Sequence, residues 1–397
     1  MNKLVNLILV FPLFLSSCAS TPKPSLIEKV KASCPEIQSW EQEKACVQDL
    51  YEVGNSGKGS TNRLKELCDL KIWKACNLYG YRFQVSMNSF WVDHFLPNPL
   101  PSWSVEKTPP KELIEYVDFL ARERGQTTHA EAVPVDTKME IGTARVVTKL
   151  KADLNQFVKD RLIAIFVLKN IGSSAVSFPV VDWKDKTTKY IIVFNYDWIK
   201  LKANDWATQK ERSPFSLKDG ITLTLEKSAD NTSQNTLEFL LLHELGHIIG
   251  HIKGWMPLGT WYFSLHEDTN PPEYYTKFYS DWEKDPRMLA WNDFREKHPI
   301  QFYREDKQRT SPKDIIDAYN ILERSEFPTL YSTTDVGDDM ADSFAAYYHS
   351  VILKKAYVLK VDFGGKLKLT IKSCWNESRC SKRRKFFDEL FASKVKN

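Results

Sequence analysis

Residues 240–251, LLLHELGHIIGH, restrict the possible fold of this 397-residue chain more than any other segment. An apolar run leads directly into His243, and Glu244 and His247 follow it. Histidines four apart on an α-helix differ in direction by about 40°, so both imidazoles face one side, about one turn apart. The pattern therefore predicts a buried helix, beginning near Ser233, that directs two ring nitrogens towards one point.

Two converging imidazoles suit a Zn²⁺ ion, which binds histidine nitrogens at about 2.0–2.1 Å. Glu244 can point at a metal-bound water instead of the metal. Zinc makes that water acidic, the glutamate takes its proton, and the resulting nucleophile attacks a polarised carbonyl. So short a motif also occurs by chance, and the alternative is a pair of surface or capping histidines. The apolar surroundings and the strand-like runs upstream favour the metal site.

A catalytic zinc usually has three protein ligands, so a further residue must complete the site. His251 lies about 12 Å from His243 along an unbroken helix, which is too far. The HExxHxxGxxH pattern of metzincin peptidases also fails, because Lys253 stands where its third histidine belongs. Two carboxylates downstream are better candidates. Asp338 and Asp342 lie four apart on one face of a helix predicted at about 338–354.

The segment DVGDDMADSFAAYYHS resembles the second helix of gluzincin peptidases, and especially of bacterial peptidases similar to anthrax lethal factor. The resemblance implies an α+β, zincin-like fold in which Asp338 is the third zinc ligand and Asp342 orients a ligand histidine. This chain has aspartate where that family usually has glutamate, so the helix must lie closer to the metal. An acidic helix N-terminus favoured by the helix dipole is the alternative. Asp339, about 100° off the ligand face, is expected to matter little for zinc binding or activity.

The same resemblance suggests a role for Tyr331, seven residues before Asp338. Its hydroxyl could stabilise the oxyanion of a tetrahedral intermediate. Buried packing explains the tyrosine equally well. His349, two turns beyond Asp342, is expected to be an ordinary polar residue near the core.

Residues 1–18 have the features of a bacterial lipoprotein signal peptide. A short positive region at Lys3 precedes an apolar run too short to span a bilayer. The run ends in LSSC, which resembles the lipoprotein cleavage box and implies a mature chain that carries lipid on Cys18. Ala19 is not the aspartate associated with inner-membrane retention in enteric bacteria. We therefore expect a lipoprotein of the cell envelope, in the outer membrane and facing the periplasm; an ordinary secretory signal is the alternative.

The chain separates into four parts. After the signal peptide, residues 19–94 form a cysteine-bridged helical module that resembles Sel1-like repeats over little more than one repeat. Residues 95–110 contain five prolines and are expected to be a linker. Residues 111–397 form the zincin-like metallopeptidase domain. Six cysteines besides Cys18 suit an oxidising compartment, and sequence proximity favours the pairs Cys34/Cys46, Cys68/Cys76 and Cys374/Cys380.

Local patterns predict the elements of that domain. Helices are expected at 111–124 and 143–160 and strands at 161–168, 190–195 and 221–226. An irregular insertion is expected at 252–330, followed after the second motif by a hairpin around Gly364-Gly365. A basic terminal helix is expected to expose the run KRRK at 382–385 to solvent.

These observations predict a lipid-anchored zinc metallopeptidase that hydrolyses peptide bonds of envelope proteins. Zn²⁺ would be held by His243, His247 and Asp338, with Glu244 as the general base. The net charge of +4 is too small to suggest a nucleic-acid partner. An inactive zincin-like module that binds an envelope partner is the alternative, although a structural metal site would not need Glu244. A hydrolase that acts on other bonds with the same metal also remains open.

Overall fold

The computed structural model describes residues 25–33, 91, 104–105, 108–123, 125–134, 152–182, 187–215, 220–255, 277–278, 300–303, 310–311, 314–363 and 366–392. The signal peptide with Cys18, the pairs Cys34/Cys46 and Cys68/Cys76, and the Gly364-Gly365 turn lie outside these residues. Across the described ranges, no helix combines the length and apolar character needed to span a membrane. The fold is α+β, as predicted.

The larger sheet has five strands in the described ranges. Its centre is formed by β3 (Leu162–Lys169) and β5 (Thr187–Asn195), which run parallel to each other. β4 (Ala175–Asp182) pairs antiparallel with β5, and β1 (Ser104–Val105) and β2 (Glu131–Ala132) pair with β3. The order β1-β3-β5-β4 places β4 at the edge of the sheet. β1 lies within the proline-rich segment 95–110.

Both faces of this sheet are buried, which agrees with the nearly continuous apolar sequence of β3 and β5. On one face, Ile165 and Val167 join the larger hydrophobic core. On the other face, Phe166 belongs to a second core, which contains Leu113 of α7 (Lys111–Glu123) and also Trp91. The rings of Trp91 and Phe166 are 5.7 Å apart.

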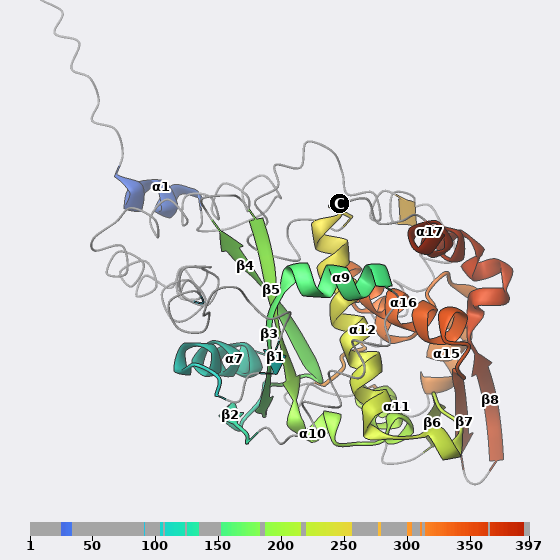
Figure 1. Cartoon of the computed structure of the whole chain (residues 1–397). Helices are drawn as coiled ribbons and strands as arrows, with labels where there is room; N and C mark the ends of the chain where they lie inside the picture. The colour runs from blue at the N-terminus through green and yellow to red at the C-terminus, as the bar shows by residue number, and fades with distance from the viewer. Residues whose placement is uncertain are drawn as a thin grey trace, which may run out of the picture.

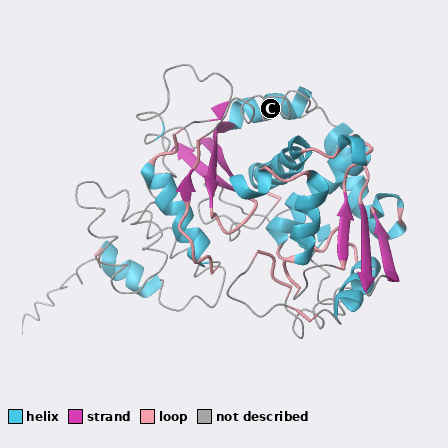
Figure 2. Cartoon of the chain, turned by 90° about the horizontal axis from the view of Figure 1, so that it is seen from below, coloured by secondary structure: helices cyan, strands magenta, loops and turns pink. Residues whose placement is uncertain are grey.

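Helix α12 (Ser233–Ile252) lies between the two sheets of the molecule (Figures 1 and 2). It begins where the sequence predicts and is buried on nearly every side from Thr236 to His251, as its apolar composition requires. It crosses α16 (Val336–Tyr347), which continues through a π-helical turn at Tyr348–Ile352. These two helices carry the two sequence motifs.

The second sheet consists of β6 (Ile221–Thr224), β7 (Val358–Phe363) and β8 (Lys366–Lys372). The predicted C-terminal hairpin is therefore present, and the strand predicted at 221–226 pairs with it rather than with the larger sheet. The other helices described are α1 (Leu26–Ser33), α9 (Ala152–Arg161), α10 (Tyr196–Ile199), α11 (Ala203–Arg212), α15 (Ile315–Arg324) and α17 (Ser381–Ala392).

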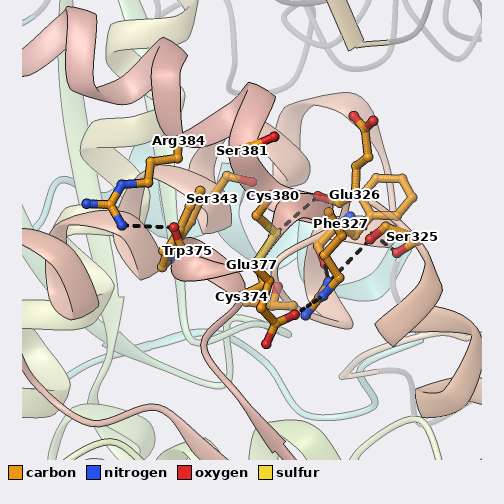
Figure 3. Close-up of a disulfide and its surroundings, with 12 residues drawn as sticks. Ser325, Glu326, Phe327, Ser343, Cys374, Trp375, Glu377, Cys380, Ser381 and Arg384 are labelled. Carbon is orange, nitrogen blue, oxygen red and sulfur yellow. Dashed lines mark hydrogen bonds and ion pairs between the residues drawn. A yellow bond between two sulfur atoms is a disulfide. The ribbon is translucent and has the colours of Figure 1, made fainter.

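The predicted disulfide between Cys374 and Cys380 is present (Figure 3). Its short loop packs against the segment that follows α15. Arg379 Nη1 donates to the carbonyl of Phe327 at 2.8 Å and approaches those of Leu322 and Ser325 at 3.3 Å. The loop thus braces the connection that leads into α16.

Several features differ from the sequence prediction, among them helices α10 and α11, which were not predicted. β4 was not predicted, because Pro179 interrupts its pattern and proline is tolerated in a sheet mainly at an edge. α15 is a regular helix within the range expected to be irregular. The basic run of α17 is not wholly solvated, because Arg383 is buried and forms an ion pair with Asp339 of α16. This ion pair gives Asp339 a structural role that the sequence pattern did not indicate.

Candidate metal centre

Three donor atoms from α12 and α16 converge on one point. The Nε2 atoms of His243 and His247 lie 3.7 and 3.5 Å from Oδ1 of Asp338, and the three residues form a group whose ligand atoms are all within 4.8 Å. Ligand atoms at about 2.0–2.2 Å from a tetrahedral ion lie about 3.3–3.6 Å from one another. The separations of 3.5 and 3.7 Å lie in or close to that range, so the donor set is compatible with Zn²⁺.

Asp338 owes its position to the first turn of α16. Asp335 caps the helix by accepting a hydrogen bond from the backbone N–H of Asp338 at 2.9 Å. Oγ1 of Thr334 lies 2.9 Å from Oδ2 of Asp338 and 2.7 Å from the carbonyl oxygen of Tyr331, so its one proton is shared between these two acceptors. Since one carboxylate oxygen is engaged by Thr334, the other is left to face the two histidines.

Asp342 lies one turn further along α16, behind His243. Its Oδ1 is 3.2 Å from Nδ1 of His243 and 3.4 Å from Nζ of Lys210, and its Oδ2 accepts from Thr329. Burial disfavours a charged Asp342, but Lys210 and His243 outweigh it and lower the pKa to about 2. An ionised Asp342 fixes the Nδ1–H tautomer of His243, so that Nε2 is free to bind a metal.

Burial likewise disfavours the imidazolium form of His243, but the carboxylates of Asp338 and Asp342 raise its pKa to about 10. The site therefore strongly favours a cation among these carboxylates.

The residues of the site differ in how far they are exposed to solvent. The side chains of His247 and Asp338 are 16% and 19% exposed, whereas that of Asp342 is only 2% exposed. Two of the three proposed ligand side chains are thus partly exposed to solvent, whereas Asp342 behind them is almost completely buried.

Glu244 is buried beside the donor set, and β4 holds it. Ser177 of β4 donates a 2.6 Å hydrogen bond to Oε2 of Glu244. This contact leaves Oε1 as the carboxylate oxygen that can accept a proton from another group. The edge strand and the motif helix are therefore linked through the predicted general base.

Tyr331 lies in a short 3₁₀ helix (Tyr331–Thr333) close to the donor set. Its ring is 5.6 Å from that of His243, and Nζ of Lys210 lies 4.8 Å from its centroid. Tyr331, His243 and Glu244 line a small, partly open cavity, in which the centre of a water molecule can move through about 20 Å³. Aromatic side chains of Trp206 and Phe239 form another part of its wall.

A second group of potential ligands is formed by Glu226, Glu238 and His349. A cation already occupies this group, because Nζ of Lys355 lies 2.9 Å from Oε1 of Glu226 and also bonds Glu238. His349 Nε2 faces the carbonyls of Leu225 and Ala356 at 3.1 and 2.9 Å. His349 is thus a structural residue near the core, as expected, and this group suits an ion pair better than a metal.

His251 is separated from the donor set, as its spacing predicts. α12 continues without a break past His251, whose Nδ1 bonds the hydroxyl of Tyr190 in β5. His266 and Glu267, the other possible ligands in the insertion, lie outside the described residues.

Apart from Asp342, sequence patterns did not identify the residues that support the site. These include Ser177, Lys210, Thr329 and Thr334. Lys210 belongs to the charged run QKER, which has the composition of a solvated helix face. The hydroxyl residues lie in segments without a recognisable motif, so only their tertiary contacts reveal them.

No protein-family model matches this chain, and no match was found among curated proteins or solved structures. The interpretation of the site therefore rests on its geometry and on the chemistry of its donor atoms.

Proposed function

We propose that this chain is a zinc-dependent peptidase with a zincin-like fold of gluzincin type. The observation that carries the proposal is the convergence of His243 Nε2, His247 Nε2 and Asp338 Oδ1 at the separations of a tetrahedral site, with Asp342 behind His243. A buried Glu244 beside this donor set supplies the base that peptide hydrolysis requires.

Bound Zn²⁺ would supply a Lewis acid that makes a water acidic and polarises a substrate carbonyl. Glu244 would take the proton from the attacking water through Oε1, because Ser177 holds Oε2. Asp342 keeps His243 in its binding tautomer throughout, and Thr334 keeps Asp338 from rotating. Tyr331 borders the same cavity, which suits a hydroxyl that stabilises developing negative charge.

The edge strand β4 supports a peptide as the substrate. Among the described strands β4 pairs only with β5, and an edge strand is the kind of element to which proteins add an extended peptide. Because Ser177 of β4 bonds Glu244, a peptide added there would pass close to the base.

The proposed setting is the bacterial cell envelope, with a lipid on Cys18 as the membrane anchor, in the outer membrane and facing the periplasm. The proposal follows from the LSSC sequence alone. Metabolic lipid labelling of the wild type and of Cys18→Ser tests it. A wild-type protein that is processed normally but carries no lipid would exclude the anchor.

The activity is tested with purified protein, a library of peptides and extracted envelope proteins, with and without a zinc chelator. We expect cleavage that the chelator abolishes and that added zinc restores. Glu244→Gln should keep zinc and lose about 10²- to 10⁴-fold in rate, because it removes a proton acceptor and no ligand. Wild-type protein that holds zinc but cleaves nothing would favour the inactive binding module.

A further inference from the structure

Helices α12 and α16 meet at Gly246 with almost no space between them. A Cβ atom built on Gly246 would lie 2.7 Å from Cα and 3.0 Å from the carbonyl oxygen of Ala341. Non-bonded carbon atoms pack at about 3.5–4.0 Å. Any side chain at position 246 would therefore push the two helices apart by about 1 Å. Glycine is otherwise unfavourable inside a helix, so this contact gives it a reason to be there.

The contact lies among the proposed ligands. Gly246 directly precedes His247, and Ala341 lies three residues after Asp338 and directly before Asp342. The separation of the helices at this point therefore sets the gap that the Asp338 carboxylate must bridge. A shift of about 1 Å would break a metal–oxygen bond whose length is about 2.0–2.2 Å.

The side chain that bridges the gap is short. Aspartate is one methylene shorter than glutamate, a difference of about 1.5 Å in reach. Oδ1 of Asp338 nevertheless lies 3.5 and 3.7 Å from the two imidazole nitrogens. Without a side chain at position 246, the two helices lie about 1 Å closer together. This distance is similar to the length of about 1.5 Å by which aspartate is shorter than glutamate.

We infer that Gly246 is a positioning residue whose missing side chain lets an aspartate, rather than a glutamate, complete the metal site. The inference rests on the proposed metal centre. It makes position 246 and the ligand at position 338 a matched pair: a larger residue at 246 requires a longer carboxylate at 338.

The alternative is that Gly246 serves only general packing. The two accounts differ in what restores a Gly246→Ala protein. If spacing at the ligand matters, Asp338→Glu should compensate, because its longer side chain spans the wider gap. Ala341→Gly should not compensate, because the contact involves backbone atoms of Ala341 that this change leaves in place.

The experiment uses the full chain and measures bound zinc by mass spectrometry and zinc affinity by competition with a chromophoric chelator. Gly246→Ala should weaken zinc binding by about 100-fold or more. Changes in residues that hold metal ligands in place typically weaken binding by about 10- to 100-fold. Gly246→Ala/Asp338→Glu should regain at least about tenfold of that loss. Gly246→Ala/Ala341→Gly should regain none. Asp338→Glu alone should bind zinc more weakly than the wild type, because its carboxylate overshoots the site.

Circular dichroism and urea unfolding of the zinc-free variants separate loss of fold from loss of the site. Gly246→Ala with wild-type zinc affinity overturns the inference and leaves the metal centre intact. The inference is also overturned if the double variant Gly246→Ala/Asp338→Glu does not regain zinc. This applies whether the double variant is unfolded or is folded without zinc. Wild-type protein that binds no zinc overturns the proposed function itself.

Discussion

Arg383 of α17 and Asp339 of α16 form a fully buried ion pair. Nη1 of the arginine lies 2.6 Å from Oδ2 of the aspartate, and the side chains are 1% and 0% exposed. Ser343 donates to the other carboxylate oxygen at 3.0 Å, and the ring of Phe278 lies 4.5 Å from the guanidinium carbon. The C-terminal helix is thereby fixed to α16 at the residue that follows Asp338.

Asp339→Ala should strongly destabilise the protein, an effect that the sequence pattern alone did not indicate. Removing one partner of a buried pair leaves an uncompensated charge, which typically costs about 3–5 kcal/mol. The free energy of unfolding, measured in urea, is the test. Glu389→Ala is the control, because its pair with Lys385 on α17 is largely exposed and should matter little. Equal effects of the two changes would contradict the prediction.

Asp338→Ala should lose zinc almost as severely as His243→Ala, since each removes one of three proposed ligands. Asp342→Asn should weaken zinc affinity or activity by about 10- to 100-fold, because it disturbs the histidine rather than the metal. Metal content across the three variants decides the assignment. Full zinc occupancy in Asp338→Ala would mean that another residue is the third ligand.

Ser177→Ala should slow turnover by about tenfold while zinc content and KM stay near their wild-type values. A tenfold effect corresponds to about 1.4 kcal/mol, a reasonable loss for one hydrogen bond to a carboxylate. Ser177→Thr retains the hydroxyl and is the matched control. If Ser177→Ala turns over substrate at the wild-type rate, the bond to Glu244 has no role in orienting the base.

The free energy of unfolding should decrease as the pH falls from 6.5 towards 4, because His349 is buried in its neutral form. Burial and the nearby Lys355 lower its pKa from 6.5 to about 4. Between these values the unfolded chain binds a proton that the folded chain does not. The stability present above pH 6.5 is therefore lost as the pH falls towards 4, by up to about 3 kcal/mol.

The measurement compares urea unfolding of the wild type and His349→Gln at pH 7.5 and pH 4.5, both without zinc. Titration of the other groups largely cancels in the comparison. The wild type should lose more stability than the variant on acidification. The same pH dependence in both proteins would contradict a buried, neutral histidine.

Regular periodicity made the main elements predictable. The apolar repeat around His243 gives α12 from Ser233, and the alternation around Gly364-Gly365 gives the C-terminal hairpin. The donor set could be predicted from the helical spacing within each of the two motifs. The family resemblance then indicated that the two motifs belong to one site. Both kinds of information are local or motif-based.

Features that depend on contacts between distant segments were not predictable. Lys210 and Arg383 lie in charged runs, and nothing local distinguishes them from solvated neighbours. Their burial follows from carboxylates that α16 places beside them. Gly246 is similar, because only the position of Ala341 shows why a side chain is excluded there.

The contact between Trp91 and Phe166 bears on how the chain can be divided and in what order it folds. A truncated chain beginning at Lys111 would lack Trp91, which packs against the larger sheet, and β1, which is a strand of that sheet. Its second core would be open to water along β3. During synthesis the N-terminal partner emerges well before β3, so this part of the core has to wait for later residues. Trimming the region before residue 111 would thus remove part of the larger sheet together with a side chain that packs on it.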